Sequence, residues 1–111
     1  MPIDLEILIT LYRDLVHENP GRRAASADSV TDIHSSLDSA EAQGIGSLLA
    51  VLAVWETNAE ACEAQLNALS ELYAGDQVTP EIIEFLGRRI DRATLTGSQA
   101  EHIDYLLSDI P

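Results

Sequence analysis

The chain has 111 residues, of which 46% are hydrophobic and 23% charged, and its 19 acidic residues outnumber 6 arginines to give a formal net charge of −13. This composition lies outside the polar class of disordered chains and predicts one globular domain over residues 1–111. The negative charge disfavours direct binding to nucleic acid or anionic membrane and favours a partner with a basic surface.

The cysteine content and the N-terminus indicate where the protein resides. One cysteine, Cys62, excludes an intrachain disulfide and a four-cysteine zinc site. Asp4 and Glu6 stand where a secretory signal would carry positive charge. The longest apolar run, residues 45–55, is shorter than the roughly 20 residues that cross a bilayer as a helix. We therefore expect a cytoplasmic protein without a membrane span.

The first third of the chain predicts two helices. Apolar residues recur at steps of three and four over residues 3–18, which is typical of an amphipathic helix, and the Asn-Pro-Gly turn at 19–21 should end it. A second helix should be capped by Ser26 or Asp28 and run to about residue 40. It has the narrowest apolar stripe in the chain, so we expect it at the periphery.

The middle of the chain contains the most apolar segment. After a break at Gln43–Gly46, the segment Ser47–Trp55 is apolar on nearly every face, which predicts a helix through the centre of the fold. Thr57 and Glu60 have the spacing of a capping box, which would begin a separate helix. One continuous helix over residues 47–73 is the alternative.

The last third predicts two more helices. Thr79 and Pro80 are typical of a helix start, and Ser98 with Glu101 has the spacing of a second capping box. No apolar run shows the period of two that marks a strand. The sequence thus predicts an all-α fold, a compact bundle of five to six antiparallel helices around residues 48–55.

Acidic residues recur along residues 56–71 at helical spacing, and no Arg or Lys occurs between Arg23 and Arg88. A solvated face that confers solubility and a docking surface for a basic partner both explain this pattern. If the face docks a partner, the candidate partner-binding residues are Glu56, Glu60, Glu63, Glu71, Asp28 and Asp32.

No spacing in the sequence predicts catalysis, a cofactor or a metal site. A carboxylate-bridged metal site in a bundle needs Glu-x-x-His pairs on further helices, and the one similar step, Asp14 to His17, is isolated. His17, His34 and His102 are scattered, and no sequence spacing links them to Cys62. We therefore expect neither an enzyme nor a metalloprotein.

We expect three further side chains in the core, those of Cys62, Trp55 and Tyr73. If Trp55 were instead exposed beside Glu56 and Glu60, it would be a suitable interface anchor.

Arginines cluster near the C-terminus. Arg88, Arg89 and Arg92 lie close in sequence to three acids, Glu81, Glu84 and Asp91, so neutralisation within the chain is the simplest interpretation. The alternative is that these arginines meet acidic residues of a partner or of a second copy in a homodimer.

The segments AEACEAQLNALSELYAGD, TPEIIEFLGRRI and LTGSQAEHIDYLL resemble the small helical immunity proteins encoded beside bacterial polymorphic toxins, including contact-dependent growth inhibition systems. The resemblance covers residues 56–107 and consists of a pattern of acids and leucines. It implies a cytoplasmic toxin inhibitor that binds a cognate toxin domain through protein–protein interaction. It assigns no residue roles.

The acidic composition agrees with this implication, because an enzyme that cuts nucleic acid presents a basic groove that an acidic protein can occupy. Two other classes stay open. A helical adaptor or regulatory subunit would expose an apolar groove, expected beside the second helix, for a partner helix. A small enzyme would need a polar pocket around a histidine or paired acids.

Overall fold

The computed structural model describes residues 3–108 and 110, and within them the chain forms an all-α bundle of six α-helices, as the sequence predicts, with no strand. The helices are α1 (Leu5–Leu15), α2 (Pro20–Ile33), α3 (Ser39–Trp55), α4 (Ala59–Ala74), α5 (Pro80–Arg89) and α6 (Gly97–Leu107). Short 3-10 turns follow α2 at His34–Ser36 and α5 at Arg92–Thr94.

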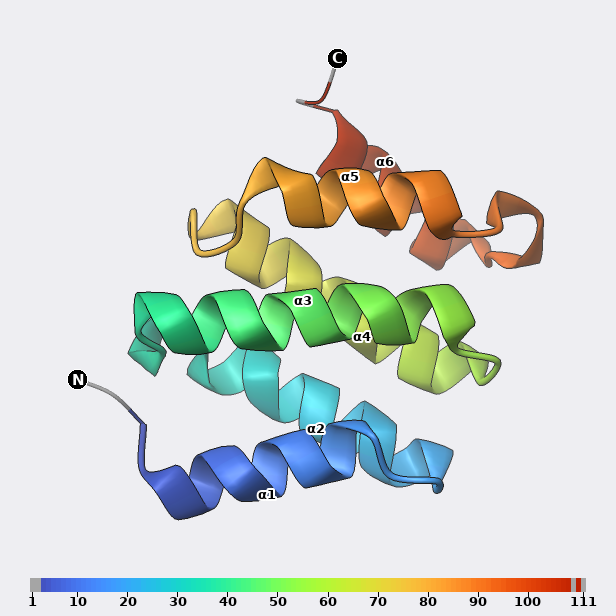
Figure 1. Cartoon of the computed structure of the whole chain (residues 1–111). Coiled ribbons are helices and arrows are strands. Elements are labelled where there is room, and N and C mark those ends of the chain that lie inside the picture. The colour runs from blue at the N-terminus through green and yellow to red at the C-terminus, as the bar shows by residue number, and fades with distance from the viewer. Residues whose placement is uncertain (1–2, 109, 111) are drawn as a thin grey trace.

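The helices form two layers (Figure 1). Helices α1, α3 and α5 lie side by side in one layer, and α2, α4 and α6 lie behind them. Consecutive helices run in opposite directions, so the chain forms three helical hairpins stacked into a slab of 38 × 31 × 18 Å. The slab has two broad faces, which we call the front face (α1, α3, α5) and the back face (α2, α4, α6).

The centre of the fold is α4, and the prediction that residues 48–55 occupy it is wrong. Helix α4 packs against α2, α3 and α6, and its Leu66, Leu69 and Leu72 are fully buried. Helix α3 lies in the front layer, where Val51 is 43% exposed. A two-layer stack leaves one side of every front helix open, so an apolar sequence alone does not place a helix at the centre.

Helix α2 begins earlier than predicted. The Asn-Pro-Gly turn is itself the start of α2, because Asn19 Oδ1 accepts hydrogen bonds from the backbone N–H groups of Gly21 at 2.8 Å and Arg22 at 3.3 Å. Pro20 occupies the first helical position, where it needs no N–H partner. The predicted caps Ser26 and Asp28 are therefore internal to the helix.

The predicted extension of the second helix to residue 40 is also wrong. Helix α2 ends at Ile33, and Asp38 starts α3 with a capping box, its Oδ1 accepting from the N–H of Glu41 at 2.8 Å while the Glu41 carboxylate accepts from the N–H of Asp38 at 2.9 Å. The predicted break at 43–46 does not occur, since α3 continues through both glycines.

Gly46 lies inside α3 because the helix approaches the segment before α5 closely there. A methyl group on Gly46 would overlap the side chain of buried Val78, whose branched Cβ leaves it little freedom to move. We expect Gly46→Ala to destabilise the fold by about 1–2 kcal/mol, because overpacking outweighs the gain in helix propensity.

Urea unfolding measures this effect, with Gly97→Ala as the control. Gly97 lies at the start of α6, and a methyl group there would meet no other atom within 4 Å. Equal midpoints for the two variants would contradict the close approach at Gly46.

Helices α3 and α4 are separate, and the continuous-helix alternative is wrong. The cap of α4 is Asn58, whose Oδ1 accepts from the N–H of Ala61 at 2.9 Å, where Thr57 was predicted. Thr79 occupies the cap position of α5 as predicted, but its side chain makes no capping hydrogen bond.

The last helix also has a different cap from the predicted one. Thr96 forms the capping box with Gln99, so the predicted pair Ser98 and Glu101 lies two residues too far along the chain. The Gln99 amide then reaches back to the carbonyl of Ala59 at 2.9 Å, which ties the start of α6 to the start of α4.

Candidate functional site

A groove of about 580 Å³ crosses the back face between α2, α4 and α6. Three of the predicted partner-binding acids line it, Asp28 from α2 and Glu60 and Glu63 from α4. The rest of its polar lining is Asn67, Thr96, Gln99 and His102. The fold therefore brings together acids that lie 32 to 35 positions apart in the sequence, and we call this feature the acidic groove.

The charge of the acidic groove is negative and largely uncompensated. Asp28 and Glu60 are exposed, and no arginine is among the described residues that line the groove. Among the described lining residues His102 is the one basic side chain, and its Nε2 lies 2.8 Å from Glu63 Oε2. Carboxylates gathered in a concave surface concentrate the negative potential there and attract a cationic partner.

Asp32 and Glu71 extend the acidic surface beyond the groove. Asp32 is exposed on α2, one turn after Asp28. Glu71 is half-exposed on α4, two turns after Glu63, and its Oε2 lies 3.8 Å from Nε2 of His34 at the end of α2. These two acids therefore lie further along the same pair of helices and do not line the groove itself.

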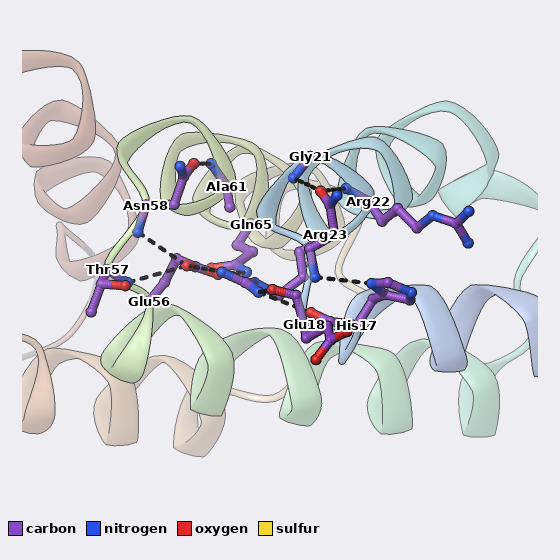
Figure 2. Close-up of polar contacts among 11 residues, drawn as sticks. His17, Glu18, Gly21, Arg22, Arg23, Glu56, Thr57, Asn58, Ala61 and Gln65 are labelled. Atoms are coloured by element: carbon purple, nitrogen blue, oxygen red, sulfur yellow. Dashed lines mark hydrogen bonds and ion pairs between the residues drawn. The ribbon is translucent and has the colours of Figure 1, made fainter.

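The predicted partner-binding residue Glu56 lies outside the acidic groove, in a buried ion pair with Arg23. Its side chain is only 3% exposed, and its two oxygens accept from Nε and an Nη of Arg23, both at 2.7 Å (Figure 2). The carboxylate also accepts from the backbone N–H groups of Thr57 and Asn58 and from the Gln65 amide. The prediction that Glu56 lies on a solvated face is wrong, because helical spacing was extended across the turn that separates α3 from α4.

The Arg23–Glu56 pair joins four helices. The second Nη of Arg23 donates to the carbonyls of His17 and Glu18, each at 2.9 Å, so the guanidinium also fixes the chain after α1 (Figure 2). Burial alone would raise the pKa of Glu56, but the hydrogen bonds from Arg23, Asn58 and Gln65 outweigh it and lower the pKa to about 2. The pair is structural, and it neutralises one of the six arginines within the protein.

Two lining residues of the groove, Glu63 and His102, align with Ser70 behind them, which bears on the enzyme alternative. His102 Nδ1 lies 3.3 Å from Ser70 Oγ, and its Nε2 faces Glu63. Ser70 is buried and donates its hydroxyl proton to the carbonyl of Leu66 at 2.9 Å. Both ring nitrogens are thus engaged within the protein and the hydroxyl does not face the groove, so neither group is positioned as a nucleophile or a base toward a substrate.

Cys62 is buried in the core, as predicted. Desolvation, with smaller contributions from the charges of Glu56 and Glu63, raises the pKa of its thiol to about 11. Since the thiolate is the reactive form, we expect no reaction with a thiol reagent at pH 8 in the folded protein and complete reaction in denaturant. Rapid labelling of the native protein at pH 8 would contradict this.

The aromatic residues divide between core and surface. Tyr73 is partly buried and packs edge-to-face on Tyr105, with ring centroids 6.3 Å apart. Trp55 is 76% exposed, so the prediction that it lies in the core is wrong. It is the last residue of α3.

The C-terminal arginines have different surroundings. Arg92 pairs with Asp104 of α6, so neutralisation within the chain occurs there through a residue distant in sequence. Arg89 lies over the ring of Phe85, 5.1 Å from its centroid, and Arg88 is exposed.

Over residues 3–108 and 110, no group of three His, Cys, Asp or Glu side chains is arranged to hold a metal ion. Within the same residues, no helix has the length and hydrophobicity needed to span a membrane.

Comparisons with protein-family models, curated proteins and solved structures give no match.

Sequence reasoning did not find the contribution of α6 to the groove. Thr96, Gln99 and His102 reach it because Gln99 bonds the start of α4, a contact between positions 40 residues apart. The capping-box pattern of Thr96 and Gln99 was visible in the sequence, and recognising it would have set the correct start of α6.

Proposed function

We propose that this chain is an acidic immunity protein that binds a cognate toxin domain and blocks its basic surface. The observation that carries the proposal is the acidic groove, in which Asp28, Glu60 and Glu63 converge without an arginine among the described lining residues. The overall charge of −13 supports it, because long-range attraction speeds association with a basic partner.

The chemistry of the groove favours a toxin that acts on nucleic acid. Such an enzyme holds phosphates with Lys and Arg side chains, and carboxylates spaced along a groove offer these cations an alternative partner. The inhibitor would then compete with the substrate for the same basic residues. On this proposal the protein acts in the cytoplasm, where the nucleic acid to be protected lies, and needs no cofactor or catalytic residue.

A second candidate function, a helical adaptor, is favoured by a different groove. Between α1 and α2 lies a groove of about 600 Å³ in which Ile7, Leu11 and Ile33 form the apolar part of the lining, with Ile7 54% exposed. The charged residues Glu6, Asp14 and Arg22 also line it. This groove lies beside the second helix, where an adaptor site was expected. A partner helix bound there mainly by apolar contact would depend less on salt than a toxin bound to the acidic groove.

Co-expression tests the proposal. The tagged chain is expressed with the C-terminal domain of the protein encoded immediately upstream, and cell survival and recovery of a complex are scored. We expect survival, with a complex that dissociates as salt is raised from about 0.05 to 0.5 M because its ion pairs are screened. Cell death despite expression of both chains would overturn the proposal, and a complex indifferent to salt would favour the adaptor.

A further inference from the structure

A second surface lies on the front face, opposite the acidic groove. Val51 of α3 and Ile82 and Phe85 of α5 line an apolar hollow of about 270 Å³ between the two helices. Trp55, one turn after Val51, extends the apolar surface toward the end of α3. We call these four residues, with Glu81 and Arg88, the α3–α5 surface.

Opposite charges flank the Phe85 ring on this surface, and the guanidinium of Arg89 lies over that ring, 5.1 Å from its centroid. Exposed Glu81 lies at the start of α5 and exposed Arg88 near its end, four residues before and three residues after Phe85. At this spacing the three residues share one side of the helix. Helix α5 therefore presents an acid, an aromatic ring and an arginine in that order along its exposed side.

This order is self-complementary. When two copies of α5 cross antiparallel around their phenylalanines, Glu81 of each copy faces Arg88 of the other, and a two-fold axis forms both pairs at once. We propose that the α3–α5 surface binds a second copy of this chain, with Val51, Phe85 and Trp55 buried at the centre. A closed two-fold contact uses the surface completely and does not extend into a filament.

The charge of the acidic groove does not oppose this arrangement at physiological ionic strength. The acidic groove lies on the back face, so in the dimer the two grooves point away from each other. The slab is 18 Å thick, which exceeds the screening length of about 8 Å at 0.15 M salt. The dimer therefore leaves both acidic grooves open, and the inference does not depend on the proposed toxin partner.

The single tryptophan of the chain reports on the contact. Because Trp55 is 76% exposed in the isolated chain, its emission should shift to shorter wavelength as concentration rises and the dimer forms. Sedimentation velocity over about 1–500 μM, the affinity range of modest interfaces, measures the mass in parallel. We expect a shift from monomer to dimer in step with the emission change. A monomer with unchanged emission at every concentration would overturn the proposal and leave the surface to a different partner.

A charge swap tests the geometry. Glu81→Arg and Arg88→Glu each place like charges at both ends of the two-fold contact, so each should weaken dimerisation at least about tenfold. The double variant restores opposite charges in exchanged positions and should recover dimerisation to within about threefold of the original chain. Additive weakening in the double variant would overturn the antiparallel arrangement.

Matched controls separate this geometry from a general effect of charge. Glu101→Arg and Arg22→Glu change the same charges at exposed positions on α6 and α2, and neither should alter the dimer. Circular dichroism of each variant verifies that the helices are intact. Loss of the dimer in the controls as well would show that net charge, and not the α3–α5 surface, governs association.

Discussion

Arg23→Ala should destabilise the fold by about 3–5 kcal/mol, because it leaves the carboxylate of Glu56 buried without its counter-charge. The variant also frees the carbonyls of His17 and Glu18, which lose their donor. The guanidinium joins the chain after α1 to the end of α3. The α1–α2 hairpin and the α3–α4 hairpin should therefore be destabilised together. Urea unfolding followed by circular dichroism measures the change.

The neighbouring arginine provides the control. Arg22 is exposed on the same helix, so Arg22→Ala should change the free energy of unfolding by less than about 0.5 kcal/mol. Replacing both members of the pair, with Arg23→Met and Glu56→Met, should recover most of the loss because no unpaired charge is then buried. Equal stabilities for Arg23→Ala and Arg22→Ala would show that the pair contributes nothing.

The same pair predicts an acid-sensitive stability. The pKa of Glu56 is lowered from 4.5 to about 2 in the folded chain, so the folded state favours the ionised carboxylate. Its contribution, about 3 kcal/mol, is fully present above pH 4.5 and is lost as the pH falls toward 2. Glu56→Gln should lack this part of the pH dependence between pH 4.5 and 2, which acid unfolding curves of the two proteins would reveal.

Reversal of two acids in the groove should weaken toxin binding at least about 100-fold. Asp28→Lys with Glu60→Lys turns attraction into repulsion at two points of the proposed contact, and close charge pairs across interfaces are each worth about 1.5 kcal/mol or more. Both side chains are exposed, so the fold should be unaffected. Surface plasmon resonance with the toxin domain gives the rates, and much of the loss should appear as slower association.

A matched variant isolates the position of the charges. Glu18→Lys with Glu101→Lys makes the same change in net charge at exposed sites that do not line the groove, and it should weaken binding by less than about tenfold through the long-range field alone. Equal losses in the two double variants would mean that total charge, and not the acidic groove, determines binding.

The helical class of the fold was predictable because its signal is local. Periodic apolar residues and the start at Thr79-Pro80 depend on a few consecutive positions, and they matched the structure. The errors arose where two local signals compete. Asn19-Pro20 both ends one helix and begins the next, and Gly46 was taken as a break although it permits close packing on Val78.

The site was predictable in part for the same reason. Glu60 and Glu63 follow from the spacing within one helix, whereas their meeting with Asp28 and His102 depends on how α2 and α6 pack on α4. Glu56 was misplaced because its partner, Arg23, is 33 positions away in the sequence. A charge pattern in a sequence thus indicates an acidic protein but does not show which acids form ion pairs within it.

Binding of the toxin domain in the acidic groove can be tested by mapping the contact residue by residue. Nuclear magnetic resonance suits a chain of 12.0 kDa. The chemical shift of each backbone amide is followed as the unlabelled toxin domain is added. We predict that the largest shifts occur at Asp28, Glu60, Glu63 and His102 on the back face. Shifts confined to α1, α3 and α5, or no shifts at all, would show that the toxin domain does not bind in the acidic groove.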